Sequence, residues 1–96
     1  DSKTKGFVKS NTAGAYTQFD RPDKAMKFYA DAVKNYSDAK SQENIAENYK
    51  AAAELMLNFR NPAKARVLLK KALNHADSSK DVQLIDEIND LLEEIA

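Results

Sequence analysis

Residues 19–25 read Phe-Asp-Arg-Pro-Asp-Lys-Ala, and residues 59–65 read Phe-Arg-Asn-Pro-Ala-Lys-Ala. Phe, Pro, Lys and Ala recur at the same places, 40 residues apart, and each Pro opens a segment with helical apolar periodicity. Proline suits the first turn of a helix, because its missing N–H needs no partner there and its φ is already set. A motif used twice at a fixed distance predicts a helix–turn–helix unit that the chain repeats.

Outward from the two motifs, apolar periodicity predicts five helices, over residues 7–19, 22–36, 42–59, 62–76 and 81–95. Residues 1–6 are polar, and we expect a flexible segment there. Residue size agrees at the 40-residue offset, where Ala13 corresponds to Ala53 and Ile45 to Ile85. We therefore predict an all-α fold of two helix pairs plus a C-terminal helix.

The composition limits the kinds of protein this chain can be. Ninety-six residues make one domain with a small core. The 15 basic and 15 acidic residues cancel, which argues against general nucleic-acid binding. The absence of cysteine excludes disulfides and thiolate metal sites, and leaves cytoplasm and periplasm equally open.

No apolar run is long enough to insert into a membrane, and no signal peptide is visible. Because the chain begins at Asp1 instead of Met, we expect it to be a module of a larger protein.

Charge is unevenly distributed along the second half of the chain. Five basic residues lie within 60–71 with no acid among them. Seven acidic residues lie within 77–94, interrupted by a single lysine. We expect two neighbouring helix faces of opposite sign that are solvated and partly pair with each other.

Two runs with the same spacing resemble the second helix of a tetratricopeptide repeat: Ala25-x3-Tyr29-x2-Ala32 and Ala65-x3-Leu69-x2-Ala72. Ala13 with Tyr16, and Ala53 with Met56, match the small and the following large residue of that family's first helix.

The resemblance covers about residues 7–95, with repeat one at about 7–36, repeat two at about 42–76 and a C-terminal helix at about 81–95. It implies that residues 7–96 form a right-handed stack. The first helices of its repeats would line a concave groove that receives peptides or helices of partner proteins.

The chain departs from the family pattern in three respects, one of which is that the proline late in the repeat is missing. Its repeat is 40 residues long instead of about 34, which is similar to the extended repeats of kinesin light chains and Rap-type regulators. Lys9 and Tyr49 take the place of the family's Trp, and Thr12 and Ala52 that of its Leu. A HEAT-like helical repeat, with a period of about 40 residues, stays open as an alternative.

The resemblance also implies which residues line the groove and bind the partner. They are Phe7, Ser10, Gly14 and Thr17 from the first helix, Glu47, Lys50, Glu54 and Asn58 from the third, and Glu87, Asp90 and Glu94 from the fifth. The carboxylates at one end lead us to expect a neutral or basic partner segment. Ser10, Gly14 and Glu54 do not match the Lys and Asn that clamp chaperone tails in this family.

No set of residues predicts catalysis. The single histidine, His75, falls in the last turn of its predicted helix, where we expect it to interact with free carbonyls. We predict a non-enzymatic scaffold for protein–protein interaction, without metal or cofactor. The alternative is an oligomerisation element that assembles through Leu84 and Leu91 of its apolar C-terminal helix.

Overall fold

The computed structural model describes residues 1–96 and is all-α, with 85% of the chain in five helices and no strand. The helices are α1 (Ser2–Gln18), α2 (Pro22–Asp38), α3 (Gln42–Asn58), α4 (Pro62–Ser79) and α5 (Val82–Glu94). The two prolines open α2 and α4, as the repeated motif predicted. The all-α class and the existence of five helices are thereby confirmed.

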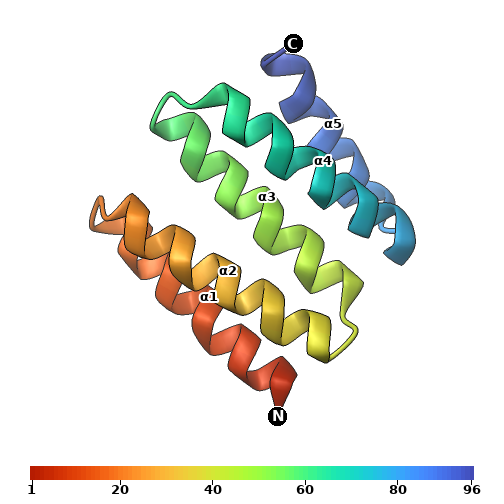
Figure 1. The fold of residues 1–96 in the computed structure, drawn as a ribbon. Helices are drawn as coiled ribbons and strands as arrows, with labels where there is room; N and C mark the ends of the chain where they lie inside the picture. Colours follow the sequence, from red (N-terminus) through yellow and green to blue (C-terminus); the bar gives the residue numbers. More distant parts are fainter.

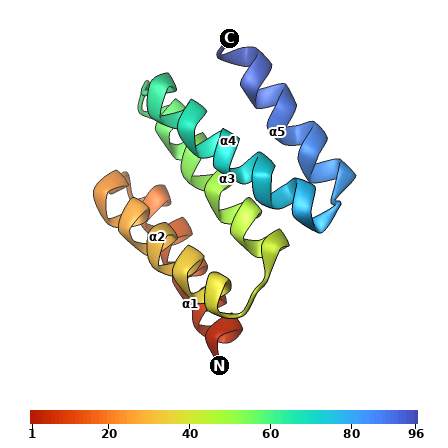
Figure 2. The ribbon, with the colours of Figure 1, turned by 45° about the vertical axis from the view of Figure 1, so that its right-hand side comes forward.

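Consecutive helices pack against each other, most extensively within the hairpins α1–α2 and α3–α4. The two hairpins lie side by side, α5 lies along α4, and the chain termini are at opposite ends (Figures 1 and 2). The molecule measures 38 × 33 × 17 Å along its principal axes, so it is flat. No helix has both the length and the apolar character that a membrane crossing needs.

The four connections between helices share one geometry. Each contains a residue in the left-handed region, with φ between 55° and 59°: Asp20, Lys40, Arg60 and Lys80. The next residue donates its N–H to a carbonyl five positions earlier, at 2.8 to 3.3 Å. This hydrogen bond satisfies a carbonyl that the helix end would leave free. Turns therefore recur every 20 residues, and the 40-residue sequence period spans two helices.

The first helix begins earlier than predicted. The sequence indicated a flexible segment over residues 1–6, whereas α1 starts at Ser2. The Asp1 carboxylate caps the helix by accepting a hydrogen bond from the Thr4 N–H at 2.8 Å. Gly6 is buried beneath the Tyr36 ring, so packing adds to the local capping.

The fourth helix ends later than predicted. Residues 77–79 were expected to break the helix after Ala76, but α4 continues to Ser79. The Ser78 and Ser79 hydroxyls donate to the Asn74 and Ala76 carbonyls within the same helix, which keeps them compatible with it. The turn is made instead at Lys80.

Small residues dominate the core. Nine of its eighteen buried apolar residues are alanines, which allow the helices to approach closely. Ala13 and Ala53, equivalent in the sequence comparison, are both fully buried. Asn48 is the only buried residue with a polar amide side chain, and its amide oxygen accepts no hydrogen bond.

Candidate partner-binding site

The predicted partner-binding residues of α1 lie at its surface. Phe7 is 60% exposed, and Ser10, Gly14 and Thr17 are half-buried. The space above Gly14 is open, because a Cβ placed there would meet no atom within 4 Å. The Thr17 hydroxyl donates to the Ala13 carbonyl at 3.0 Å and is thus occupied within the helix.

Three of the predicted residues come together between α3 and α5. The Lys50 ammonium lies 3.7 Å from the Glu54 carboxylate and 3.8 Å from the Glu87 carboxylate. The first pair is local, at i and i+4 on α3, whereas the second joins two helices. Lys50 is the more buried member of both pairs, which screens them less than a fully exposed pair.

An acidic hollow of about 210 Å³ lies beside this cluster, where α3 and the beginning of α5 meet. Four carboxylates line it, those of Glu43, Glu47, Asp81 and Glu87. Partial burial at the edge of the hollow is the main reason why the pKa of Glu47 lies above its ordinary value. The Glu43, Asp81 and Glu87 carboxylates raise this pKa further, and Lys50 partly offsets them.

A second hollow of about 500 Å³ lies between the first turns of α1 and α3. Phe7, Tyr36 and Glu43 line it together with Asp1 and Lys3. Burial raises the pKa of the Tyr36 hydroxyl, and the Glu47 carboxylate adds to that effect. Glu43 lines both hollows, so the two hollows adjoin at this residue on the side of the molecule formed by α1, α3 and α5.

The structure gathers only part of the predicted set. Phe7, Glu47 and Glu87 line the two hollows, and Lys50 and Glu54 join them through ion pairs. The others line no hollow: Ser10, Gly14, Thr17, Asn58, Asp90 and Glu94.

The sequence analysis did not predict two of the four acidic residues that line the hollow, Glu43 and Asp81. Glu43 could have been found as the residue one turn before Glu47 on the same face of α3. Asp81 caps α5 by accepting a hydrogen bond from the Leu84 N–H at 3.1 Å. Its position before a helix therefore indicated a capping role and not a binding role.

The basic residues of α4 and the acidic residues of α5 do not pair with each other, contrary to prediction. All three ion pairs of the structure lie elsewhere, in Lys9–Asp31 and in the two pairs of Lys50. Arg66, the basic residue that reaches the end of α5, donates to the Ile95 carbonyl at 2.7 Å. The basic residues of α4 and the acidic residues of α5 thus form no ion pair with each other.

His75 has a structural environment that differs from the predicted one. Its Nδ1 forms a hydrogen bond with the Gln42 side-chain oxygen of α3, and its ring stacks on Tyr49 at 5.8 Å. It therefore contacts a neighbouring helix instead of the free carbonyls of its own. No group of three or more His, Cys, Asp or Glu side chains is arranged to hold a metal ion.

The apolar residues of α5 are used within the chain. Leu84 is 4% exposed, Ile88 is fully buried, and Leu91 packs half-buried against the core. Val82, at the start of the helix, is 69% exposed. Leu84 is therefore not available as a contact surface for assembly.

No family model matches the chain, and neither the curated proteins nor the solved structures compared with it include a match.

Proposed function

We propose that this chain is a non-catalytic scaffold for protein–protein interaction. In this proposal the surface formed by α1, α3 and α5 binds a peptide or helical segment of a partner. We further propose that the helices form a right-handed stack of the extended tetratricopeptide type. The equal turns at 20-residue spacing and the 40-residue sequence correspondence support that arrangement.

The observation that carries the proposal is that the two hollows adjoin at Glu43, which lines both of them. Phe7, exposed at one end, offers an apolar anchor for a partner side chain. The other end holds four carboxylates. Lys50 lies beside them and forms ion pairs with Glu54 and Glu87. A partner segment with an apolar residue followed by basic residues suits this order.

The carboxylates would act mainly on specificity and association rate. Exposed charge pairs contribute little affinity, typically below about 1 kcal/mol each. A field of one sign nevertheless attracts a segment of the opposite sign and repels an acidic one. Affinity would then come from burial of apolar side chains against Phe7 and Tyr36.

The test measures binding of labelled synthetic peptides to the whole chain by fluorescence anisotropy. One peptide carries Leu and Phe anchors among Lys and Arg, and its counterpart replaces the basic residues by Glu. We expect the basic peptide to bind more tightly, and Glu43→Lys with Glu87→Lys to weaken it about tenfold.

The matched control is Asp86→Lys with Glu93→Lys, which makes the same charge change at exposed positions of α5 that do not line the hollow. It should leave the affinity within about twofold of the original. Equal weakening by both double variants, or no preference for the basic peptide, would contradict the proposal.

A further inference from the structure

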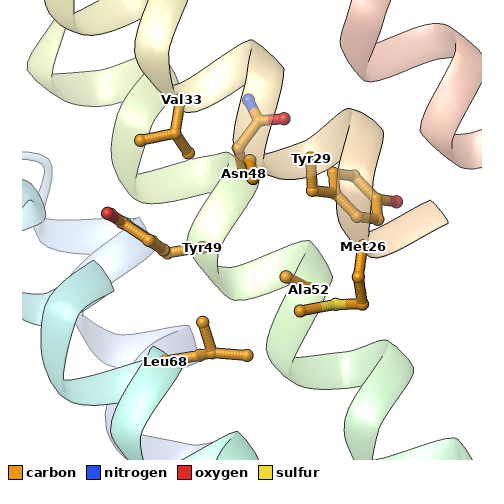
Figure 3. Close-up of a pocket in the computed structure, with 8 residues that line it drawn as sticks. Met26, Tyr29, Val33, Asn48, Tyr49, Ala52 and Leu68 are labelled. Carbon is orange, nitrogen blue, oxygen red and sulfur yellow. The ribbon is translucent and has the colours of Figure 1, made fainter. Parts of the chain in front are cut away.

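An apolar groove runs between α2 and α4 with α3 as its floor, on the face of α3 opposite to Glu43 and Glu47. Its deepest part is a cavity of about 60 Å³, several times the room that one water molecule needs (about 10–15 Å³). Seven of the eight residues that line it are hydrophobic. Met26, Ala30 and Val33 come from α2, Tyr49 and Ala52 from α3, and Leu68 from α4 (Figure 3).

The groove continues past Met26 into a wider hollow of about 460 Å³. Met26, Met56 and Phe59, the last of which is 45% exposed, form the apolar part of its lining, and Asp23, Asn61 and Lys64 form the polar part. Tyr49 in the first cavity and Met56 in the second are seven residues apart on α3, which corresponds to about 10 Å. Two apolar side chains at positions i and i+7 of a bound helix are separated by the same distance.

The borders of the groove are basic. Lys64 lines the wider hollow, and the Lys71 ammonium lies 5.8 Å from the centre of the Tyr49 ring. Between them on the same side of α4 lies Val67, 54% exposed. On α2, Lys27 and Lys34 each lie one turn from the exposed Ala30.

Asp23, at the first turn of α2, is the one acidic residue that lines either part of the groove. The apolar floor is thus framed by ammonium groups from both walls. Such a surface attracts a segment that combines apolar side chains with carboxylates.

We propose that this groove binds an acidic amphipathic helix of a partner protein, whose apolar residues at i and i+7 enter its two parts. The charge complementarity carries the choice of partner. A second copy of this chain does not offer such a helix, because the acidic α5 has Leu84 and Ile88 buried against its own core. The groove and its ligand differ in face and in charge from the surface proposed above.

The probe is a labelled synthetic helical peptide with Leu at i, i+3 and i+7 and Glu at its remaining charged positions. Its counterpart has Lys in place of every Glu. Anisotropy titrations with the whole chain should show the acidic peptide binding at least about tenfold more tightly than the basic one.

Two sets of variants test where the peptide binds. Lys64→Glu with Lys71→Glu should weaken the acidic peptide about tenfold and improve the basic one. Lys5→Glu with Lys70→Glu, which changes the same charge away from the groove, should leave both titrations unchanged. Ala30→Glu, at an exposed helical position, should also weaken the acidic peptide, and circular dichroism checks that each variant remains helical.

Equal binding of the two peptides, or an equal loss in the Lys5 and Lys70 control, would overturn the proposal. So would retention of binding in both Lys64→Glu with Lys71→Glu and Ala30→Glu. A concentration-dependent dimer in light scattering that disappears in Lys64→Glu with Lys71→Glu would assign the groove to a second copy and would also overturn it.

Discussion

At the residue scale, the two glycines of α1 differ in the space around them. Gly6 is buried, and a Cβ there would lie 3.0 Å from three atoms of the Tyr36 ring. Gly14 has no atom within 4 Å of the same position. In a helix, glycine costs about 1 kcal/mol relative to alanine at either position. Only the neighbours decide which of them can be replaced.

Gly14→Ala should raise the free energy of unfolding by about 1 kcal/mol, because it gains helix propensity without meeting another atom. Gly6→Ala gains the same propensity but must displace the Tyr36 ring, so we expect no gain or a net loss. Urea denaturation of both variants measures the difference. An equal increase in both would show that the Tyr36 ring moves freely and would contradict this explanation.

At the element scale, the helix ends depend on four residues that are poorly suited to their conformation. Their φ angles all lie near 57°: Asp20, Lys40, Arg60 and Lys80. In this left-handed conformation a residue with a Cβ atom is strained by about 1–2 kcal/mol, whereas glycine is not. The backbone hydrogen bond that follows each of them is what defines the turn. Helix length, and with it the 20-residue spacing, is set by these turns.

Lys40→Gly should stabilise the protein by about 0.5–1 kcal/mol, because glycine removes the strain of the left-handed turn. Lys34→Gly, an exposed interior position of α2, should lower stability by about 1 kcal/mol through lost helix propensity. Chemical denaturation of both variants checks the opposite signs. A loss of stability in Lys40→Gly would mean that the lysine side chain contributes to the turn.

At the scale of the whole molecule, the net charge of zero conceals a separation of charge. Glu43 and Glu47 lie on one face of α3 together with Asp81 and Glu87 of the neighbouring helix. The opposite face of α3 lies beneath a groove bordered by lysines such as Lys64. This separation is the reason why two ligands of opposite charge are proposed for one small domain.

Partial burial and, secondarily, the neighbouring carboxylates predict a pH effect at Glu47. Its pKa in the folded protein lies above the ordinary value of 4.5, so folding favours the protonated form. That contribution is present below about pH 4.5 and is lost as the pH rises through the raised pKa. Wild type should therefore lose a little stability between pH 4.5 and neutral pH on account of this residue.

Glu47→Gln removes this loss. The variant should be more stable than wild type at pH 7, by a few tenths of a kcal/mol because Glu47 is largely exposed, and the advantage should shrink towards pH 4.5. Thermal unfolding at a series of pH values measures both quantities. Parallel curves for the two proteins would contradict the assigned cause.

The helices were predictable because their signals are local. Apolar periodicity and the prolines at residues 22 and 62 located the first residues of α2, α3 and α4, since each signal acts within one turn. The first turn of α1 was missed because residues 1–6 carry no apolar periodicity, so that its local Asp1 cap was overlooked, and because the contact of Gly6 with Tyr36 joins two helices. The predicted end of α4 was wrong because serines that read as a break instead bond back to their own helix.

The candidate site was predictable only in part. Lys50 with Glu54 follows from spacing along one helix, whereas Lys50 with Glu87 depends on how α5 lies against α3. Glu43 of α3 and Asp81 at the start of α5 line the acidic hollow together for the same reason, because it depends on the relative position of the two helices. Charge sign along the sequence indicated an acidic region, but it did not show that the basic residues of α4 would remain unpaired with it.

The sequence by itself determined the all-α class and the existence of five helices, because hydrogen bonds from i to i−4 and capping act over a few residues. Only the tertiary structure decided which charges meet, where the hollows lie and what His75 contacts. The Lys50–Glu87 ion pair and the Gln42–His75 hydrogen bond each join residues more than 30 positions apart, and their geometry depends on how closely alanine-rich helix faces can approach.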